Sequence, residues 1–294
     1  MKALAVAAAA LVASAVAGAA PPKPAKTVRL HLPRHGAVAR AEHKRNRALA
    51  EHLAELGTGF HGWAGFWVHD LRTGATAGWN SDARFPAAST AKLGVLAAAL
   101  RRFGPYPERS PAWRDLRAMT RTSDNRATNR LVNRLGGLTP VREALHRLGM
   151  RSSTYPGPYR EDTSVGDAPR PPPRPHWRVT TAHDLGRALY AFQAAALGNR
   201  WVQHTTGLSR HEAEVALALL LATSPQGANA GLLRQSLPGA RLAEKNGWIE
   251  DMRGTAAIVY LPRGPKIVVV LVYRPKLEPR DAKALGTKVA RLVR

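Results

Sequence analysis

The sequence predicts an α+β fold in which one antiparallel sheet is assembled from both ends of the chain, with a helical lobe inserted between them. Three observations lead to this prediction. A strand–turn–strand pattern covers residues 63–79, helical patterns dominate from residue 91 to 221, and three short apolar segments follow residue 237. This order of elements differs from the alternating strand–helix units that build parallel sheets.

The N-terminal part of the domain is predicted to form a helix and a hairpin. Residues 38–56 carry apolar side chains at helical spacing and end at Gly57, which favours a helix that stops there. Residues 63–69 and 75–79 are strand-like, and the turn sequence 70–74 between them ends in glycine. A short loop then leads to Ser89.

The middle of the chain is predicted to be a helical lobe over about residues 91–205. Helical patterns cover residues 91–102, 113–120, 125–135, 140–148, 182–196 and 210–222. Residues 155–175 contain seven prolines, which argue against regular structure. A loop of this length within a compact domain is usually functional or mobile.

The C-terminal part supplies the remaining strands. Residues 241–245, 255–261 and 266–273 are the candidate strands, with a Pro-Arg-Gly turn between the last two, and residues 281–293 form a closing helix. We expect a single domain over residues 38–294, and the sequence contains no internal repeat.

The first residues indicate export. An apolar run follows Met1-Lys2 and ends in small residues, so residues 1–19 are predicted to be a signal peptide cleaved after Ala19. The alternative is a retained membrane anchor, but the run is short and Pro21-Pro22 ends it. Residues 20–37 are rich in proline and lysine and are typical of a tether. The chain has no cysteine, which excludes disulfides, thiolate chemistry and attachment of a lipid at cysteine.

The formal net charge of the 294-residue chain is +24. Nucleic-acid binding is disfavoured, because the basic residues are scattered and no zinc-finger spacing, RNP-like strand or Gly-rich phosphate loop is present. For an exported protein, anionic polymers of the cell envelope are the more natural partners. Compositional bias towards arginine explains the charge equally well, and the two interpretations stay open at this point.

The tetrad Ser89-Thr90-Ala91-Lys92 is the first candidate for chemistry. Positions i and i+3 share one helix face, so the Lys92 amine can approach the Ser89 oxygen. Serine becomes a nucleophile when a neighbouring base removes its proton, and a desolvated lysine is such a base. Taken alone, the pattern also fits a capped helix with a solvated lysine.

Two further motifs follow in the chain. Ser123-Asp124-Asn125 precedes a predicted helix, and Lys245-Asn246-Gly247 lies at the end of a predicted strand. Each is weak by itself, because the first also reads as a helix N-cap and the second as a turn.

In this order, the three motifs resemble those of the penicillin-recognising serine hydrolases, which comprise the class A β-lactamases and the related penicillin-binding proteins. That family carries Ser-x-x-Lys, then Ser-Asp-Asn, then Lys-Thr-Gly. The segments 85–92 and 119–137, and Thr180-Thr181-Ala182 before a helix, resemble the family as well. The resemblance covers about residues 60–294.

The resemblance implies a role for each matching residue. Ser89 would attack an amide or lactam carbonyl and form an acyl-enzyme, and Lys92 would take its proton directly or through water. Ser123 would pass a proton to the leaving nitrogen. Lys245 would supply positive potential near that relay and near a substrate carboxylate. Asn125 would contact the substrate or brace Lys92.

The third motif would complete the site, although it departs from the family pattern. The backbone N–H groups of Ser89 and Trp248 would form the oxyanion hole, and Gly247 would let substrate lie close to the strand. Asn246 replaces the usual threonine, so its amide would contact the substrate in place of a hydroxyl. Trp248 could crowd or stack on substrate, or simply pack. Arg253 could supply a carboxylate contact, or lie on the surface.

Two further departures concern the helical lobe and deacylation. The interval from Ser89 to Ser123 is shorter than in class A enzymes, which predicts a trimmed lobe and a more open cleft. Class A enzymes activate the deacylating water with a glutamate in an Ω-loop, and Glu161 falls at about that place without the usual Leu-Asn context. Glu161 is therefore a candidate base and equally a solvated loop carboxylate; Asp162 and Asp167 are weaker candidates.

The resulting expectation is an exported, monomeric serine hydrolase that acts on a β-lactam or a D-alanyl cell-wall peptide without a cofactor. The histidines lack metal-binding spacing, so no metal site is expected. The alternative is a non-catalytic or slowly deacylating penicillin-binding or wall-binding protein of the same fold. The motifs leave the choice among β-lactamase, D,D-peptidase and inactive homologue open.

Overall fold

The computed structural model describes residues 37–159 and 178–294. The predicted signal peptide, nearly all of the tether and the candidate base Glu161 lie outside these ranges. Residues 40–294 belong to one compact unit. Its first helix, α2, spans Ala37–Thr58 and agrees with the predicted helix over 38–56. No helix in the described ranges combines the length and the apolar character needed to span a bilayer.

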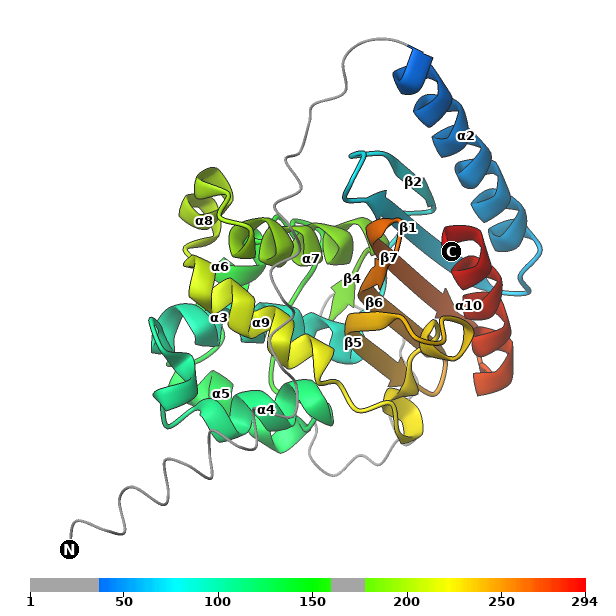
Figure 1. The fold of residues 1–294 in the computed structure, drawn as a ribbon. Helices are drawn as coiled ribbons and strands as arrows, with labels where there is room; N and C mark the ends of the chain where they lie inside the picture. The colour runs from blue at the N-terminus through cyan, green and yellow to red at the C-terminus, as the bar shows by residue number, and fades with distance from the viewer. Residues whose placement is uncertain (1–36, 160–177) are drawn as a thin grey trace, which may run out of the picture. The chain divides into compact units, whose positions relative to one another are not determined.

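The sheet has the predicted α+β arrangement, with strands from both chain ends side by side. Its five antiparallel strands are ordered β2-β1-β7-β6-β5. Their bounds are Trp63–Asp70 (β1), Thr76–Trp79 (β2), Arg241–Ile249 (β5), Met252–Leu261 (β6) and Gly264–Tyr273 (β7). The N-terminal strand β1 pairs with the C-terminal strand β7 along its whole length, so the two ends of the domain close one sheet (Figure 1).

Alternating side chains of the sheet enter two separate cores. In β7, Ile267, Val269 and Leu271 pack towards the helical lobe, whereas Val268 and Val270 pack towards the terminal helices. Successive residues of a strand point to opposite faces, and a strand buried on both faces therefore has a continuous apolar sequence. This explains the unbroken run of aliphatic residues in β7.

Helices cover both faces of the sheet. One face packs against α2 and α10 (Pro279–Val293), and the other against the helical lobe (Figure 1). The lobe contains α3 (Lys92–Phe103), α4 (Trp113–Arg121), α5 (Asn125–Arg134), α6 (Thr139–Arg147), α7 (Ala182–Ala196), α8 (Arg200–Thr206) and α9 (Arg210–Leu221). All the predicted helices of the lobe are present.

Three local features differ from the sequence predictions. The seven-residue helix α8 was not predicted. A two-stranded pairing of β3 (Phe85–Pro86) with β4 (Val179–Thr180) joins segments far apart in the chain. The third motif lies inside β5 rather than at a strand end, because β5 continues to Ile249 and turns only at residues 250–251.

Candidate active site

Ser89 lies in a single 3-10 turn, η1 (Ala88–Ala91), that connects β3 to α3. The preceding residue, Ala88, has a φ of 44°, a region that non-glycine residues occupy only when the surroundings enforce it. Ser89 is half-buried, and its hydroxyl has no hydrogen-bond partner in the described ranges. The turn thus presents this hydroxyl at the start of α3.

Lys92 begins α3 and its side chain is 1% exposed. Its Nζ donates to the carbonyl of Ser123 at 2.5 Å and to Asn125 Oδ1 at 2.7 Å, and it lies 3.3 Å from Ser123 Oγ. Burial, followed by the charges of Lys245 and Arg178, holds the pKa of Lys92 well below its usual value. A lysine in this environment favours the neutral form, which is the form able to accept a proton.

Ser123 is the meeting point of the two buried lysines. It lies between α4 and α5 with a φ of 61°, a second strained position at the site. The Nζ of Lys245 donates to Ser123 Oγ at 2.9 Å, on top of the contact from Lys92. Because the Ser123 oxygen accepts from Lys245, its own proton remains available for another acceptor. The sequence places these three residues far apart, and the fold brings them together.

Lys245 lies on β5 and is 1% exposed. Burial lowers its pKa to about 7, while the neighbouring Glu244 opposes the shift. Its Nζ also donates to the carbonyl of Asn246 at 2.9 Å. The two lysines therefore share one serine in a site where water is excluded from both amines.

Gly247 allows β5 to pass directly beside the nucleophile turn. A Cβ at this position would lie 3.0 Å from the Ser89 nitrogen and 3.1 Å from the Ala87 carbonyl oxygen. Contacts that short are tighter than most Cβ contacts in proteins, so a larger residue would push the strand and the turn apart by a few tenths of an ångström, and glycine favours the close approach. Since β5 is the last strand of the sheet, alternate N–H groups on its outer side are not used by β6. The Trp248 N–H as an oxyanion donor stays a prediction.

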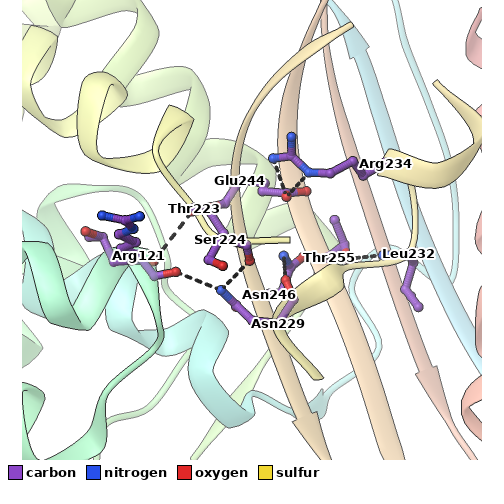
Figure 2. A network of polar contacts seen from close by, with 10 residues as sticks. Arg121, Thr223, Ser224, Asn229, Leu232, Arg234, Glu244, Asn246 and Thr255 are labelled. Atoms are coloured by element: carbon purple, nitrogen blue, oxygen red, sulfur yellow. Dashed lines mark hydrogen bonds and ion pairs between the residues drawn. The ribbon is translucent and has the colours of Figure 1, made fainter. Parts of the chain in front are cut away.

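The side chain of Asn246 is 1% exposed and belongs to a polar network that anchors β5 (Figure 2). Its Nδ2 donates to the Asn229 carbonyl at 2.9 Å, and its Oδ1 accepts from Thr255 at 2.7 Å. Asn229 in turn donates to the carbonyls of Arg121 and Ser224. The amide predicted to contact substrate thus braces the strand, and direct substrate contact stays a prediction.

A cavity of about 360 Å³ borders the third motif. It is lined by Asn246, Gly247, Arg253 and Lys283, together with glycine-rich and apolar residues. Arg253 Nη1 donates to the carbonyls of Ile249 and Met252, and Arg253 forms no ion pair with any described residue. Both arginine and lysine there are available to an anion. The half-buried Trp248 lies opposite Arg253 in the β5–β6 register.

Two residues that the sequence analysis did not select also flank Lys92. The Tyr159 ring centroid lies 4.5 Å from Lys92 Nζ, and the Arg178 guanidinium carbon lies 3.7 Å from the same centroid. Neither residue belongs to a motif, and their convergence depends on the fold, so no sequence signal could have identified them. Glu161 lies outside the described residues, and its role as a base stays a prediction.

The described residues contain no cluster of three or more histidines, cysteines or carboxylates that could hold a metal ion. The groups that converge at Ser123 Oγ are two lysine amines, which suit proton transfer and anion binding rather than cation binding.

Comparison with known families decides the assignment of the chain. The model of a family described as the β-lactamase enzyme family matches residues 48–105 and 104–294. The chain belongs to the β-lactamase enzyme family. The match covers all three motifs. A comparison with curated protein sequences finds no match.

Solved structures show the same fold. The structure of PBP-A aligns with a TM-score of 0.67 and 23% identity, covering 84% of this chain and 94% of that chain. A β-lactamase from Sphaerobacter thermophilus gives 0.64 and 20%, covering 84% and 95%. An ancestral class A β-lactamase gives 0.65 and 24%, covering 83% and 98%. At these identities the likeness establishes the fold, and the family match establishes a β-lactamase-related serine hydrolase.

Proposed function

We propose that this β-lactamase-related protein is an exported acyl-transferring hydrolase, which forms an acyl-enzyme through Ser89 with a β-lactam or a D-alanyl cell-wall peptide. The observation that carries the proposal is the convergence of Lys92 and Lys245 on Ser123, at 3.3 and 2.9 Å, beside the turn that holds Ser89. A purely structural role would not require two buried lysines around one hydroxyl.

The proposed acylation follows a closed proton path. Neutral Lys92 accepts the Ser89 proton as Oγ bonds to the substrate carbonyl carbon, giving a tetrahedral oxyanion. The carbon–nitrogen bond then breaks, the Ser123 hydroxyl protonates the leaving nitrogen, and Lys92 returns its proton to Ser123 across 3.3 Å. Protonated Lys245 supports this step electrostatically, and the N–H groups of Ser89 and Trp248 receive the oxyanion.

The cavity beside Gly247 is the proposed site for a substrate carboxylate. Arg253 and Lys283 line it without an ionic partner among the described residues. Anions bind favourably to such groups, and a guanidinium can bind a carboxylate in a bidentate manner. A penicillin and a D-alanyl peptide both carry a free carboxylate near the scissile bond. This explains how the site could function although Asn246 replaces a hydroxyl residue.

Covalent labelling tests the proposal. A fluorescent penicillin should label the protein at Ser89 and increase its mass by that of the intact drug, because a lactam leaving group stays attached. Ser89→Ala should abolish labelling, whereas Ser110→Ala, a serine bonded to the Pro107 carbonyl away from the site, should preserve it. Undiminished labelling of the Ser89→Ala protein would sink the assignment.

A slowly deacylating penicillin-binding protein is the second candidate. Within the described ranges, the polar side chains that contact the Lys92 amine are those of Ser123 and Asn125, and the ring beside it belongs to Tyr159. In support, a variant of PBP-A, at 23% identity, has been captured as an acyl-enzyme with penicillin G.

Turnover distinguishes the two candidates. A β-lactamase should hydrolyse a chromogenic cephalosporin through many cycles, whereas a penicillin-binding protein should give one stoichiometric burst and then stall. If Glu161 is the deacylating base, Glu161→Gln should abolish steady-state hydrolysis and preserve the burst. Unchanged hydrolysis in this variant would remove Glu161 from the mechanism.

Export and binding to envelope polymers form part of the same proposal. The apolar segment over residues 3–17 and the net charge of +24 support them. Cell fractionation and the N-terminal mass of the mature protein test the export. Sedimentation with purified cell wall tests the polymer binding, which should be unaffected by Ser89→Ala. Binding abolished by that substitution would instead identify the wall peptide as the bound substrate.

A further inference from the structure

Among the described residues, the Arg178 guanidinium is held in place by neutral groups. Its Nη2 donates to the carbonyls of Gly157 and Pro158 at 2.7 and 3.2 Å, and its guanidinium carbon lies 3.7 Å from the centroid of the Tyr159 ring. No described carboxylate forms an ion pair with it, and its Nε is buried without a partner. Neutral carbonyls and a ring fix the guanidinium while leaving its full charge in place.

Tyr159 joins this charge to the catalytic lysine. Its ring also lies against Lys92 Nζ, so two cations approach one ring. Its hydroxyl donates to the Ala88 carbonyl at 2.8 Å, and the Asn129 amide holds its backbone N–H and carbonyl at 2.8 and 2.7 Å. Burial raises the pKa of Tyr159 to about 12, so the ring stays neutral and offers no negative charge to either cation.

The charges that act on Lys92 come from three segments. Lys245 on β5 and Arg178 before β4 disfavour a proton on Lys92, whereas Asp124 before α5 favours one. The Asp124 carboxylate accepts the backbone N–H of Ala127 as a helix cap, which directs one of its oxygens towards α5. Burial is the largest cause that favours the neutral amine, and Arg178 adds to it from behind the Tyr159 ring that contacts Lys92 Nζ.

We propose that Arg178 is a positioning residue for the acylation step: stacked on Tyr159, it holds a fixed positive charge beside Lys92 and favours the neutral amine that accepts the Ser89 proton. The inference rests on the proposed function, because it concerns the same lysine. It adds a guanidinium as a second source of positive potential beside that of Lys245.

Direct titration of Lys92 tests the inference independently of activity. In protein labelled with ¹³C at lysine Cε, the resonance lost in Lys92→Arg identifies Lys92, and its midpoint is followed against pH. Arg178→Gln should raise this midpoint by about one pH unit, because a neighbouring cation has been removed. Arg178→Lys, which keeps a cation near the ring, should shift it less. An unchanged midpoint in a folded Arg178→Gln protein overturns the inference.

The acylation rate gives the second readout. In Arg178→Gln the acid limb of the rate–pH profile should move to higher pH by the same amount, with the plateau largely retained. Arg142→Gln is the matched control, because Arg142 Nε donates to the Tyr155 carbonyl of the same loop, and Arg142 is not among the charges that act on Lys92. An equal shift in the control would indicate general loosening of the loop and overturn the inference. Absence of acylation at every pH would instead refute the proposed function, and the Lys92 midpoint would still report on Arg178.

Discussion

At position 247 the absence of a side chain brings the edge strand against the nucleophile turn. The Cβ of an alanine there would meet the backbone of Ser89 and Ala87, which cannot move aside as a flexible side chain could. Gly247→Ala should therefore lower the acylation rate by on the order of 100-fold at a modest cost of about 1–3 kcal/mol in stability. Stopped-flow labelling and urea unfolding of the same protein measure the two effects.

Gly157→Ala is the matched control for this substitution. No atom lies within 4 Å of a Cβ at Gly157, and its φ is outside the left-handed region. Acylation and stability should both stay near those of the parent protein. If Gly247→Ala acylated as fast as this control, the close approach of β5 to Ser89 would have no role in catalysis.

Lys245 determines the alkaline limit of the proposed reaction. Its pKa is lowered to about 7 by burial, so the ammonium loses its proton as the pH rises through that value. Because the charged form supports the transfer of the Ser123 proton to the leaving nitrogen, the acylation rate should fall above about pH 7. Lys245→Arg keeps its charge at all working pH values, so its alkaline limb should disappear even if its maximal rate is lower. If the alkaline limb remained in Lys245→Arg, a group other than Lys245 would be responsible for it.

At the scale of elements, the polar network behind β5 holds the third motif against the helical lobe (Figure 2). Arg234 donates to one carboxylate oxygen of the fully buried Glu244 at 2.9 and 2.7 Å, and the Thr223 hydroxyl donates to the Glu244 carbonyl. Burial raises the pKa of Glu244, although the charge of Arg234 opposes this. The arginine thus compensates a carboxylate that would otherwise be buried alone.

Arg234→Met should destabilise the protein by about 3–5 kcal/mol, because it leaves the Glu244 carboxylate buried without a counter-charge. The double variant Arg234→Met with Glu244→Leu should recover most of this loss, because both polar groups are then replaced by apolar ones. Urea denaturation of the four proteins of the cycle gives the coupling energy. Additive effects in the double variant would contradict a direct interaction.

Elements that form through interactions between residues close in the sequence could be predicted, whereas elements that depend on residues far apart in the sequence could not. The long helices and β7 were predictable because local periodicity and apolar runs determine them. Helix α8 is only seven residues long, and the β3–β4 pairing joins segments about 95 residues apart. The end of β5 was misplaced because Gly247 and Asn246 suggest a turn locally, whereas their packing against η1 and Thr255 keeps the strand extended.

The motif residues at the site were predictable for a different reason: their order along the chain resembles that of a known family. The structure brings Lys92, Ser123 and Lys245 into contact as that resemblance implied. Tyr159 and Arg178 belong to no motif; Tyr159 contacts Lys92 Nζ, and Arg178 stacks on the Tyr159 ring. Such contacts depend on tertiary structure alone.

For the whole molecule, the two buried lysines couple folding to pH. An unfolded lysine has a pKa near 10.4, so between about pH 7 and 10 the unfolded chain binds more protons at Lys245 than the folded protein does. Stability must then rise with pH across this window, by up to about 1.4 kcal/mol per pH unit for each such lysine. Burial lowers the pKa of Lys92 in the same direction, so both lysines contribute with the same sign.

Urea unfolding from pH 7 to 9.5 should therefore show a free energy of unfolding that rises with pH. In a protein with a net charge of +24, charge repulsion alone does not set this slope, because the two buried lysines contribute to it. The range stops at pH 9.5 because Tyr159 and Tyr260, whose pKa values are raised to about 12, make stability fall with pH once unfolded tyrosines begin to ionise.

Lys245→Met removes one of the two amines and should reduce the slope by about half, whereas Lys288→Met, on the exterior helix α10, should leave it unchanged. A slope of equal size in Lys245→Met and the parent would show that burial does not lower the pKa of this lysine in the folded protein, and the alkaline limit assigned to Lys245 would fail with it.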